Sequence, residues 1–207
     1  MQRRKIEDID RDKFSEKMHS ESDRACAILG AAFLDAKLES LFIRRIKNFQ
    51  AELLNGTGPI STFSARIRIA NALAWIDDPV QKDLDVIRGI RNDFAHSFDH
   101  ELSFHDQSLV NRCENLLVAQ SYIGGYDDSI GAPDQNLSEH VIKNIKETFQ
   151  APRWRFQLSV DFISQYLDDI PADQFEYQGS DLLQEVRDLS ANARGKISAT
   201  GTVSPAK

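Results

Sequence analysis

Apolar residues recur along almost the whole chain at the spacing of an α-helix, and no stretch of any length alternates between apolar and polar residues. Successive helical residues are turned by roughly 100°, so apolar positions three and four apart share one face, whereas a half-buried strand needs one at every second position. The spacing therefore predicts an all-α fold, arranged as a single-domain bundle of about seven or eight helices.

The strongest periodicity covers residues 23–49, which we expect to form the central helix of the bundle. One apolar stripe is rich in small residues and a second carries larger ones (Ala25, Leu29, Ala32, Phe33 and Ala36; Leu34, Leu38, Leu41 and Phe42). A helix with apolar residues on two sides is usually surrounded by other helices. Ser20 or Ser22 can cap its first turn.

Residues that favour helix ends divide the rest of the chain. The later helices each have a hydroxyl, a carboxylate or a proline as the candidate start (Ser61 or Thr62, Asp77 with Pro79, Asp106, Pro152 and Ser180). Gly124 and Gly125 are expected to end a helix, because glycine is a poor helix former. The turn-rich residues 124–135 are then predicted to be a surface loop, followed by a short amphipathic helix over 137–149.

The two ends of the chain differ in composition from its middle. Residues 1–19 are highly charged and weakly periodic, so we predict a charged N-terminal arm there, either a loosely held helix or disordered. Residues 194–207 are small and polar and are predicted to be a disordered tail, because they can bury little apolar surface. The all-helical domain is expected to cover residues 20–193.

The overall charge limits the kinds of partner. The chain has 207 residues, with 25 Lys and Arg against 32 Asp and Glu, and a formal net charge of −7 at pH 7. Such a charge argues against direct binding of nucleic acid, whose phosphates attract basic surfaces. No stretch approaches the roughly 18–20 apolar residues of a membrane span, and we see no signal peptide. We therefore expect a cytoplasmic protein that does not bind membranes.

The residues that could carry metal or redox chemistry are few. Cys26 and Cys113 show no CxxC or Cys/His spacing, so we expect two buried thiols. His100 and His105 do not form a metal-binding pattern. We expect no metal and no cofactor, and these features favour a protein that is not an enzyme.

Arg91 is unusually placed within the segment Ile-Arg-Gly-Ile-Arg-Asn-Asp-Phe-Ala-His, residues 87–96. On a helical wheel it falls in the same arc as apolar residues (Leu84, Ile87, Phe94 and Ala95). A guanidinium cannot be buried without a partner, because an unpaired buried charge costs several kcal/mol. We predict a structural ion pair between Arg91 and a carboxylate of the central region (Glu21, Asp35 or Glu39). Arg66 and Arg68 are expected to reach solvent or an acidic neighbour.

A polar face lies roughly 140° from that arc on the same helix. It contains Asp85, Gly89, Asn92 and His96. The missing side chain of Gly89 would let another backbone approach closely. We predict that this face is an interaction face, buried against a second copy of the chain in a homodimer.

Four blocks of the sequence resemble the mannitol-repressor (MltR) family. They are SESDRACAILGAAFLDAKLESL (20–41), ELLNGTGPISTFSARIRIANAL (52–73), DLDVIRGIRNDFAHS (83–97) and APRWRF (151–156). The resemblance implies an all-helical cytoplasmic regulator of mannitol-operon transcription that has no DNA-binding motif of its own. It also implies that the chain acts through another regulatory protein.

A broader resemblance concerns the segment Arg-Asn-Asp-Phe-Ala-His. Its R-x4-H arrangement is similar to that of the HEPN superfamily, which implies a HEPN-like helical core. In the nuclease members, Arg and His meet across a dimer interface and act on RNA without a metal. Carried onto this chain, Arg91, Asn92 and His96 would be the catalytic residues, with His96 as acid and base and Arg91 stabilising charge on the phosphate.

Three functions therefore compete. The first is a transcriptional regulator that works through protein–protein interaction, favoured by the four blocks and the acidic charge. The second is a metal-independent ribonuclease, favoured by Arg91, Asn92 and His96 and disfavoured by the net charge. The third is a direct DNA-binding repressor, which would need a helix-turn-helix with a basic recognition helix, and no segment fits that requirement well.

Overall fold

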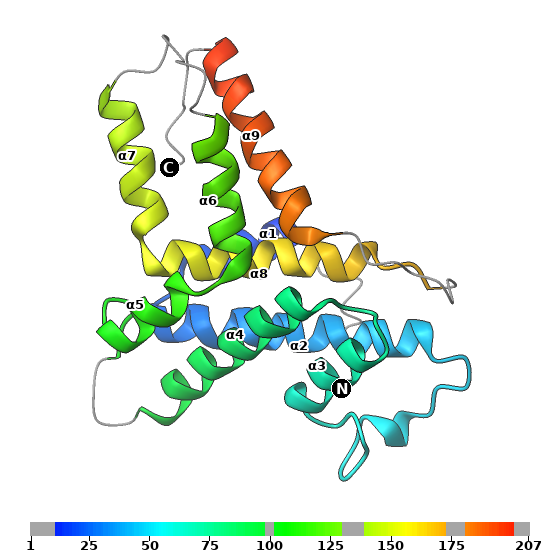
Figure 1. Ribbon diagram of the computed structural model, residues 1–207. Helices are drawn as coiled ribbons and strands as arrows, with labels where there is room; N and C mark the ends of the chain where they lie inside the picture. Colours follow the sequence, from blue (N-terminus) through cyan, green and yellow to red (C-terminus); the bar gives the residue numbers. More distant parts are fainter. Residues whose placement is uncertain (1–10, 98–101, 130–138, 173–180, 201–207) are drawn as a thin grey trace.

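The computed structural model describes residues 11–97, 102–129, 139–172 and 181–200 (Figure 1). In these ranges the chain forms α1 (Arg11–Ser20), α2 (Asp23–Arg45), α3 (Phe63–Ala72), α4 (Asp78–His96), α5 (Gln107–Glu114), α6 (Leu117–Ser129), α7 (Glu139–Gln150), α8 (Pro152–Asp169) and α9 (Leu182–Thr200). A short 3-10 helix covers Ala51–Leu53, and the described residues contain no strand. The all-α prediction is confirmed.

Helices α2 and α8 run side by side through the middle of the molecule and in the same direction. Asp23 at the start of α2 pairs with Arg153 at the start of α8, with 2.7 Å between Oδ1 and Nη1. Arg44 near the end of α2 donates to the Leu167 carbonyl of α8 at 2.9 Å. In Figure 1, α3 and α4 lie on the α2 side of this pair, whereas α6, α7 and α9 rise from the α8 side.

Several helix starts follow the predicted capping residues. The side chains of Ser22, Thr62 and Asp77 accept hydrogen bonds from backbone N–H groups of α2, α3 and α4, at 3.3, 3.2 and 2.9 Å. Pro79 and Pro152 lie in the first turns of α4 and α8. Backbone N–H groups in a first turn have no acceptor within the helix, so proline removes no helical hydrogen bond there. Ser180, the predicted cap of the last helix, lies outside the described residues.

The packing around α2 agrees with one predicted stripe and corrects the other. The larger apolar residues are fully buried (Leu34, Leu38, Leu41 and Phe42), whereas Ala32 of the small-residue stripe is exposed. The small residues that lie inside are Ala27, Gly30 and Ala31. A Cβ at Gly30 would lie 3.0 Å from the Phe156 ring and 3.2 Å from the sulfur of Met18. Close packing of α1, α2 and α8 therefore depends on this glycine.

The two ends of the chain agree with the predictions to different degrees. Residues 11–20 form α1, in agreement with the helical alternative for the charged N-terminal arm, and Met18 is fully buried against the core. Phe14 also stacks on Phe33, with ring centroids 3.9 Å apart, but two apolar residues in ten were too weak a signal to predict these contacts. Residues 194–200 complete α9 instead of belonging to a disordered tail, and Ala and Lys in this stretch are good helix formers. Residues 1–10 and 201–207 lie outside the described residues.

Gly124 and Gly125 lie inside α6, so the prediction that they end a helix is wrong. Residues 124–129 of the predicted loop are helical, and 130–135 lie outside the described residues. A Cβ at Gly125 would lie 2.1 Å from the carbonyl oxygen of Arg187 in α9. The two glycines therefore permit close contact between α6 and α9, and this contact outweighs their low helix propensity.

Candidate functional site

The apolar side of α4 fixes the helix within the bundle. Leu84, Ile87, Ile90 and Phe94 are completely buried, and Phe94 lies beside Phe104 with ring centroids 5.2 Å apart. Asp77 caps the first turn. The polar side of α4 is therefore held in a fixed orientation by burial of the opposite side.

Arg91 lies at the edge of this apolar side and is half-buried. Its Nη1 donates to the side-chain oxygen of Asn92 at 2.9 Å. Among the described residues, Arg91 forms no ion pair with Glu21, Asp35 or Glu39, so the predicted pairing is corrected. The edge position lets the charged head extend away from the core while the stem stays against it.

Arg66 of α3 forms the buried ion pair that we predicted for Arg91. Its side chain is 6% exposed, and its Nη2 lies 2.6 Å from Asp35 Oδ1 and its Nη1 4.0 Å from Glu39 Oε2. Nη1 also donates to the Ile60 carbonyl at 2.7 Å. The prediction that Arg66 would reach an acidic neighbour is confirmed, although its burial was not foreseen. This arginine joins α3 to α2.

The four residues of the predicted interaction face keep partial access to solvent. Asp85 accepts from Arg88 of the same helix at 3.2 Å, and His96 is exposed at the last position of α4. A Cβ at Gly89 would lie 3.2 Å from Nη1 of Arg112. The close approach that Gly89 permits is thus made by a side chain of α5 in the same chain.

Charges of both signs border this face. Arg112 pairs with Asp93 at 2.7 Å, and these side chains are 41% and 38% exposed. At the end of α4, Arg24 of α2 donates to the carbonyl of Ser97. The face therefore presents a mixed-charge, half-exposed surface, which suits polar recognition by another protein better than burial in the core of one chain.

The structure does not bring Arg91 and His96 into contact within one chain. Residues five apart on a helix are turned by roughly 140° from each other. The described residues contain no group of three or more His, Cys, Asp or Glu that could hold a metal ion. A reaction using both residues would need a second chain to supply one of them.

The two cysteines are unsuited to chemistry in the folded state. Cys26 and Cys113 are completely buried and free, as predicted. Burial raises the pKa of Cys26 to about 11 and that of Cys113 to about 12. Because the thiolate is the nucleophile, neither residue is reactive near neutral pH.

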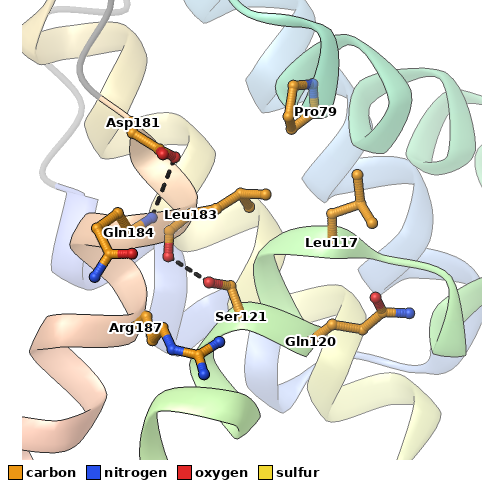
Figure 2. Close-up of a pocket in the computed structure, with 8 residues that line it drawn as sticks. All are labelled: Pro79, Leu117, Gln120, Ser121, Asp181, Leu183, Gln184 and Arg187. Atoms are coloured by element: carbon orange, nitrogen blue, oxygen red, sulfur yellow. Dashed lines mark hydrogen bonds between the residues drawn. The ribbon is translucent and has the colours of Figure 1, made fainter.

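A shallow, open pocket of about 520 Å³ lies where the first turns of α4, α6 and α9 meet, and the sequence did not indicate it. Figure 2 shows Asp181 and Pro79 at one end, Gln120 and Arg187 at the other, and Leu117, Ser121 and Leu183 between them. The Ser121 hydroxyl donates to the Leu183 carbonyl. The lining residues come from three segments far apart in sequence, so no local pattern could reveal them.

None of the helices in the described part of the chain is long and apolar enough to cross a membrane. No family model, curated protein or solved structure matches the chain. The functional argument therefore rests on the sequence blocks described above and on the geometry of α4 and the helices around it.

Proposed function

We propose that this chain is a cytoplasmic regulator of the mannitol-operon repressor type, which acts by binding another protein. The polar face of α4 formed by Asp85, Gly89, Asn92 and His96 is the surface through which two copies pair, and the resulting dimer binds the partner protein. The acidic net charge of −7 supports action through a protein partner over direct contact with DNA.

One observation carries the proposal. The blocks that resemble the mannitol-repressor family are separated in sequence, the last of them by more than fifty residues, yet they supply most of α2, α3 and α4 and the start of α8, and α2 packs on each of the other three helices. A resemblance spread over unrelated surface segments would be less informative. Here it coincides with one packed unit, and the polar face of α4 belongs to that unit.

The regulator is proposed to form a homodimer through the same face. A two-fold interface uses the same patch on both copies. Two ion pairs lie at this face, Arg88 with Asp85 and Arg112 with Asp93. Each copy therefore presents positive and negative side chains to the other copy. Such an arrangement favours specific pairing over high affinity.

Transcription in cells tests the regulatory role. In cells of the source organism that lack the gene, mannitol-operon transcripts should rise, and the parent protein should restore repression. Asn92→Arg, which places a bulky charge on the face, should fail to do so. Asn192→Arg is the matched control, because Asn192 is exposed on α9. Equal repression by both variants would remove the face from the proposal, and unchanged transcripts in the deleted cells would reject the regulatory role.

A HEPN-type ribonuclease is the second candidate, and the state of Arg91 favours it. Arg91 is not committed to the ion pair that would have made it purely structural, and the nearby His96 is exposed. Purified protein should then cleave RNA in the presence of a chelator, and folded His96→Ala should not. His105→Ala is the control, since His105 is also exposed. Absence of cleavage by the parent would reject this candidate.

A further inference from the structure

Oppositely charged side chains line one side of the shallow pocket at the first turns of α4, α6 and α9 (Figure 2). Asp181 precedes α9, and Arg187 lies in the second turn of that helix, six residues later. A helix rises by about 1.5 Å per residue, so the two positions are roughly 9 Å apart along the helix axis. A molecule that pairs with both side chains must therefore carry a positive and a negative group several bonds apart.

Further carboxylates lie near Asp181. Burial raises the pKa of Asp77, and the charges of Asp181 and Asp78 raise it further. Asp181 itself is exposed, and its Oδ1 caps α9 by accepting from the N–H of Gln184 at 3.2 Å. This end of the pocket therefore attracts a cation. Since the described residues contain no group of three or more His, Cys, Asp or Glu that could hold a metal ion, an organic cation fits this end better.

Arg187 provides the opposite charge. Its guanidinium lies beside α6, where a Cβ at Gly124 would be 3.0 Å from Nη1. A guanidinium has five N–H donors in a planar fork, and two of them can hold both oxygens of one carboxylate. The Arg187 end of the pocket therefore suits a carboxylate.

The polar side chains beside these charges have their donors engaged. The Nε2 of Gln184 donates to Asp188 Oδ1 at 2.8 Å, and the Ser121 hydroxyl donates to the Leu183 carbonyl. The amide oxygen of Gln184 and the hydroxyl oxygen of Ser121 can each accept a hydrogen bond. An ammonium group has three donors and no acceptor, so it matches these side chains as well as Asp181.

The rest of the lining is apolar and is held in place by other contacts. Pro79, Leu117 and Leu183 supply apolar surface between the charged side chains. The carboxylate of Asp83 in α4 accepts from the N–H groups of Leu117 and Val118 at 2.8 and 2.9 Å, which fixes the start of α6 against α4. Helix α6 in turn packs closely on α9. The walls of the pocket are therefore in position before a ligand arrives.

We propose that this pocket binds a small organic zwitterion, an ω-amino acid whose ammonium group pairs with Asp181 and whose carboxylate pairs with Arg187. The hydrocarbon chain between the two groups lies on Leu117 and Leu183. Because the ligand contacts α4, α6 and α9 together, its binding fastens the α6–α9 pair to α4. The pocket shares no residue with the polar face of α4, so this site does not depend on the proposed regulatory function.

NMR titration of the full-length protein with 6-aminohexanoic acid at pH 7 tests the site. Backbone amides of Leu117, Ser121 and Gln184 should shift and saturate with a Kd of about 1–10 mM, because an open pocket buries only part of a small ligand. Amides of residues 34–38 in α2 are the internal reference and should not move. Hexanoic acid and hexylamine, which carry one charge each, should bind at least about tenfold more weakly. Glycine is too short to reach both charges and should also bind at least about tenfold more weakly.

Two substitutions assign the charges. Asp181→Asn keeps a good helix-capping residue and should weaken binding of 6-aminohexanoic acid at least about tenfold, as should Arg187→Gln. Glu185→Gln is the matched control, because Glu185 is exposed on α9 outside this pocket, and it should retain the parent affinity. If Arg187→Gln does not fold, Asp181→Asn and the singly charged analogues still decide. Absence of saturable shifts, equal binding of a singly charged analogue, or parent affinity in Asp181→Asn would overturn the proposal.

Discussion

The α2–α3–α4 unit and the α6–α9 pair are held together by different means. In the first, long side chains make the connections, as in the pair of Arg66 with Asp35, and polar caps start each helix. In the second, two backbones approach directly, because Gly125 leaves no side chain between α6 and the Arg187 carbonyl. Helices joined by long side chains can shift slightly relative to each other, whereas helices in direct backbone contact cannot.

This difference explains why one region was easier to predict. A capping serine or aspartate carries the same meaning wherever it occurs before a helix. A glycine pair has two opposite meanings, a helix end or a site of close packing, and only the partner helix decides between them. The following substitutions sharpen the comparison, starting with the largest expected effect.

Replacing Arg66 by Ala should lower the free energy of unfolding by about 3 kcal/mol, because it leaves Asp35 without its partner in a mostly buried place. Arg68→Ala is the matched control, since Arg68 is exposed on the same helix and should change stability by less than about 0.5 kcal/mol. Urea denaturation followed by circular dichroism measures both. Equal losses would mean that α3 is not held by its buried ion pair.

Gly125→Ala should destabilise the protein by about 1–3 kcal/mol, because the new Cβ forces α6 and α9 apart. At the adjacent Gly124, a Cβ would meet Nη1 of Arg187 at 3.0 Å, the end of a flexible side chain that can move. Gly124→Ala should therefore be neutral, or stabilising by up to about 1 kcal/mol through higher helix propensity. The same denaturation experiment compares them, and a harmless Gly125→Ala would contradict direct backbone contact.

Arg91→Ala should cost only about 0.5–1 kcal/mol, because the hydrogen bond to Asn92 joins neighbouring residues at a half-buried position. Thermal unfolding of this variant beside Arg66→Ala separates the two arginines. A loss as large as that of Arg66→Ala would restore the structural ion pair that the sequence predicted for Arg91.

Ala74→Gly should stabilise the protein by about 0.5–1 kcal/mol, because a left-handed conformation is costly for a residue with a Cβ. Ala74 has a φ of 52° and follows α3, where the N–H of Trp75 bonds to the Ala70 carbonyl at 2.9 Å. Ala72→Gly, at the last residue of α3, should have the opposite sign, because glycine is a poorer helix former than alanine. A shift of both melting temperatures in the same direction would contradict this account of the helix end.

The fold class and most helix starts could be predicted because they depend on local signals. Each of four helix starts is indicated by its own capping residue or proline, independently of the rest of the chain (Ser22, Thr62, Asp77 and Pro152). The division of the segment after Asp106 into α5 and α6 was not predicted, and neither was the packing of α1 on the core through Phe14 and Met18.

The candidate site could be predicted only in part. The periodicity of α4 correctly separated its buried side from a polar face, but the partners of that face depend on tertiary structure. No sequence pattern indicated that Arg112 would lie over Gly89 or that Arg66 would pair with Asp35. The hydrogen bond from the Leu117 N–H to Asp83 was equally unpredicted. Each of these contacts links residues whose proximity follows from helix packing, and a periodic pattern contains no such information.

Sedimentation velocity at micromolar concentration tests most directly whether the polar face of α4 binds another chain. The parent and Asn192→Arg should sediment as dimers, and Asn92→Arg should sediment as a folded monomer. A parent protein that remains monomeric throughout this range would contradict the proposed homodimer, and a dimer that survives Asn92→Arg would place its interface elsewhere.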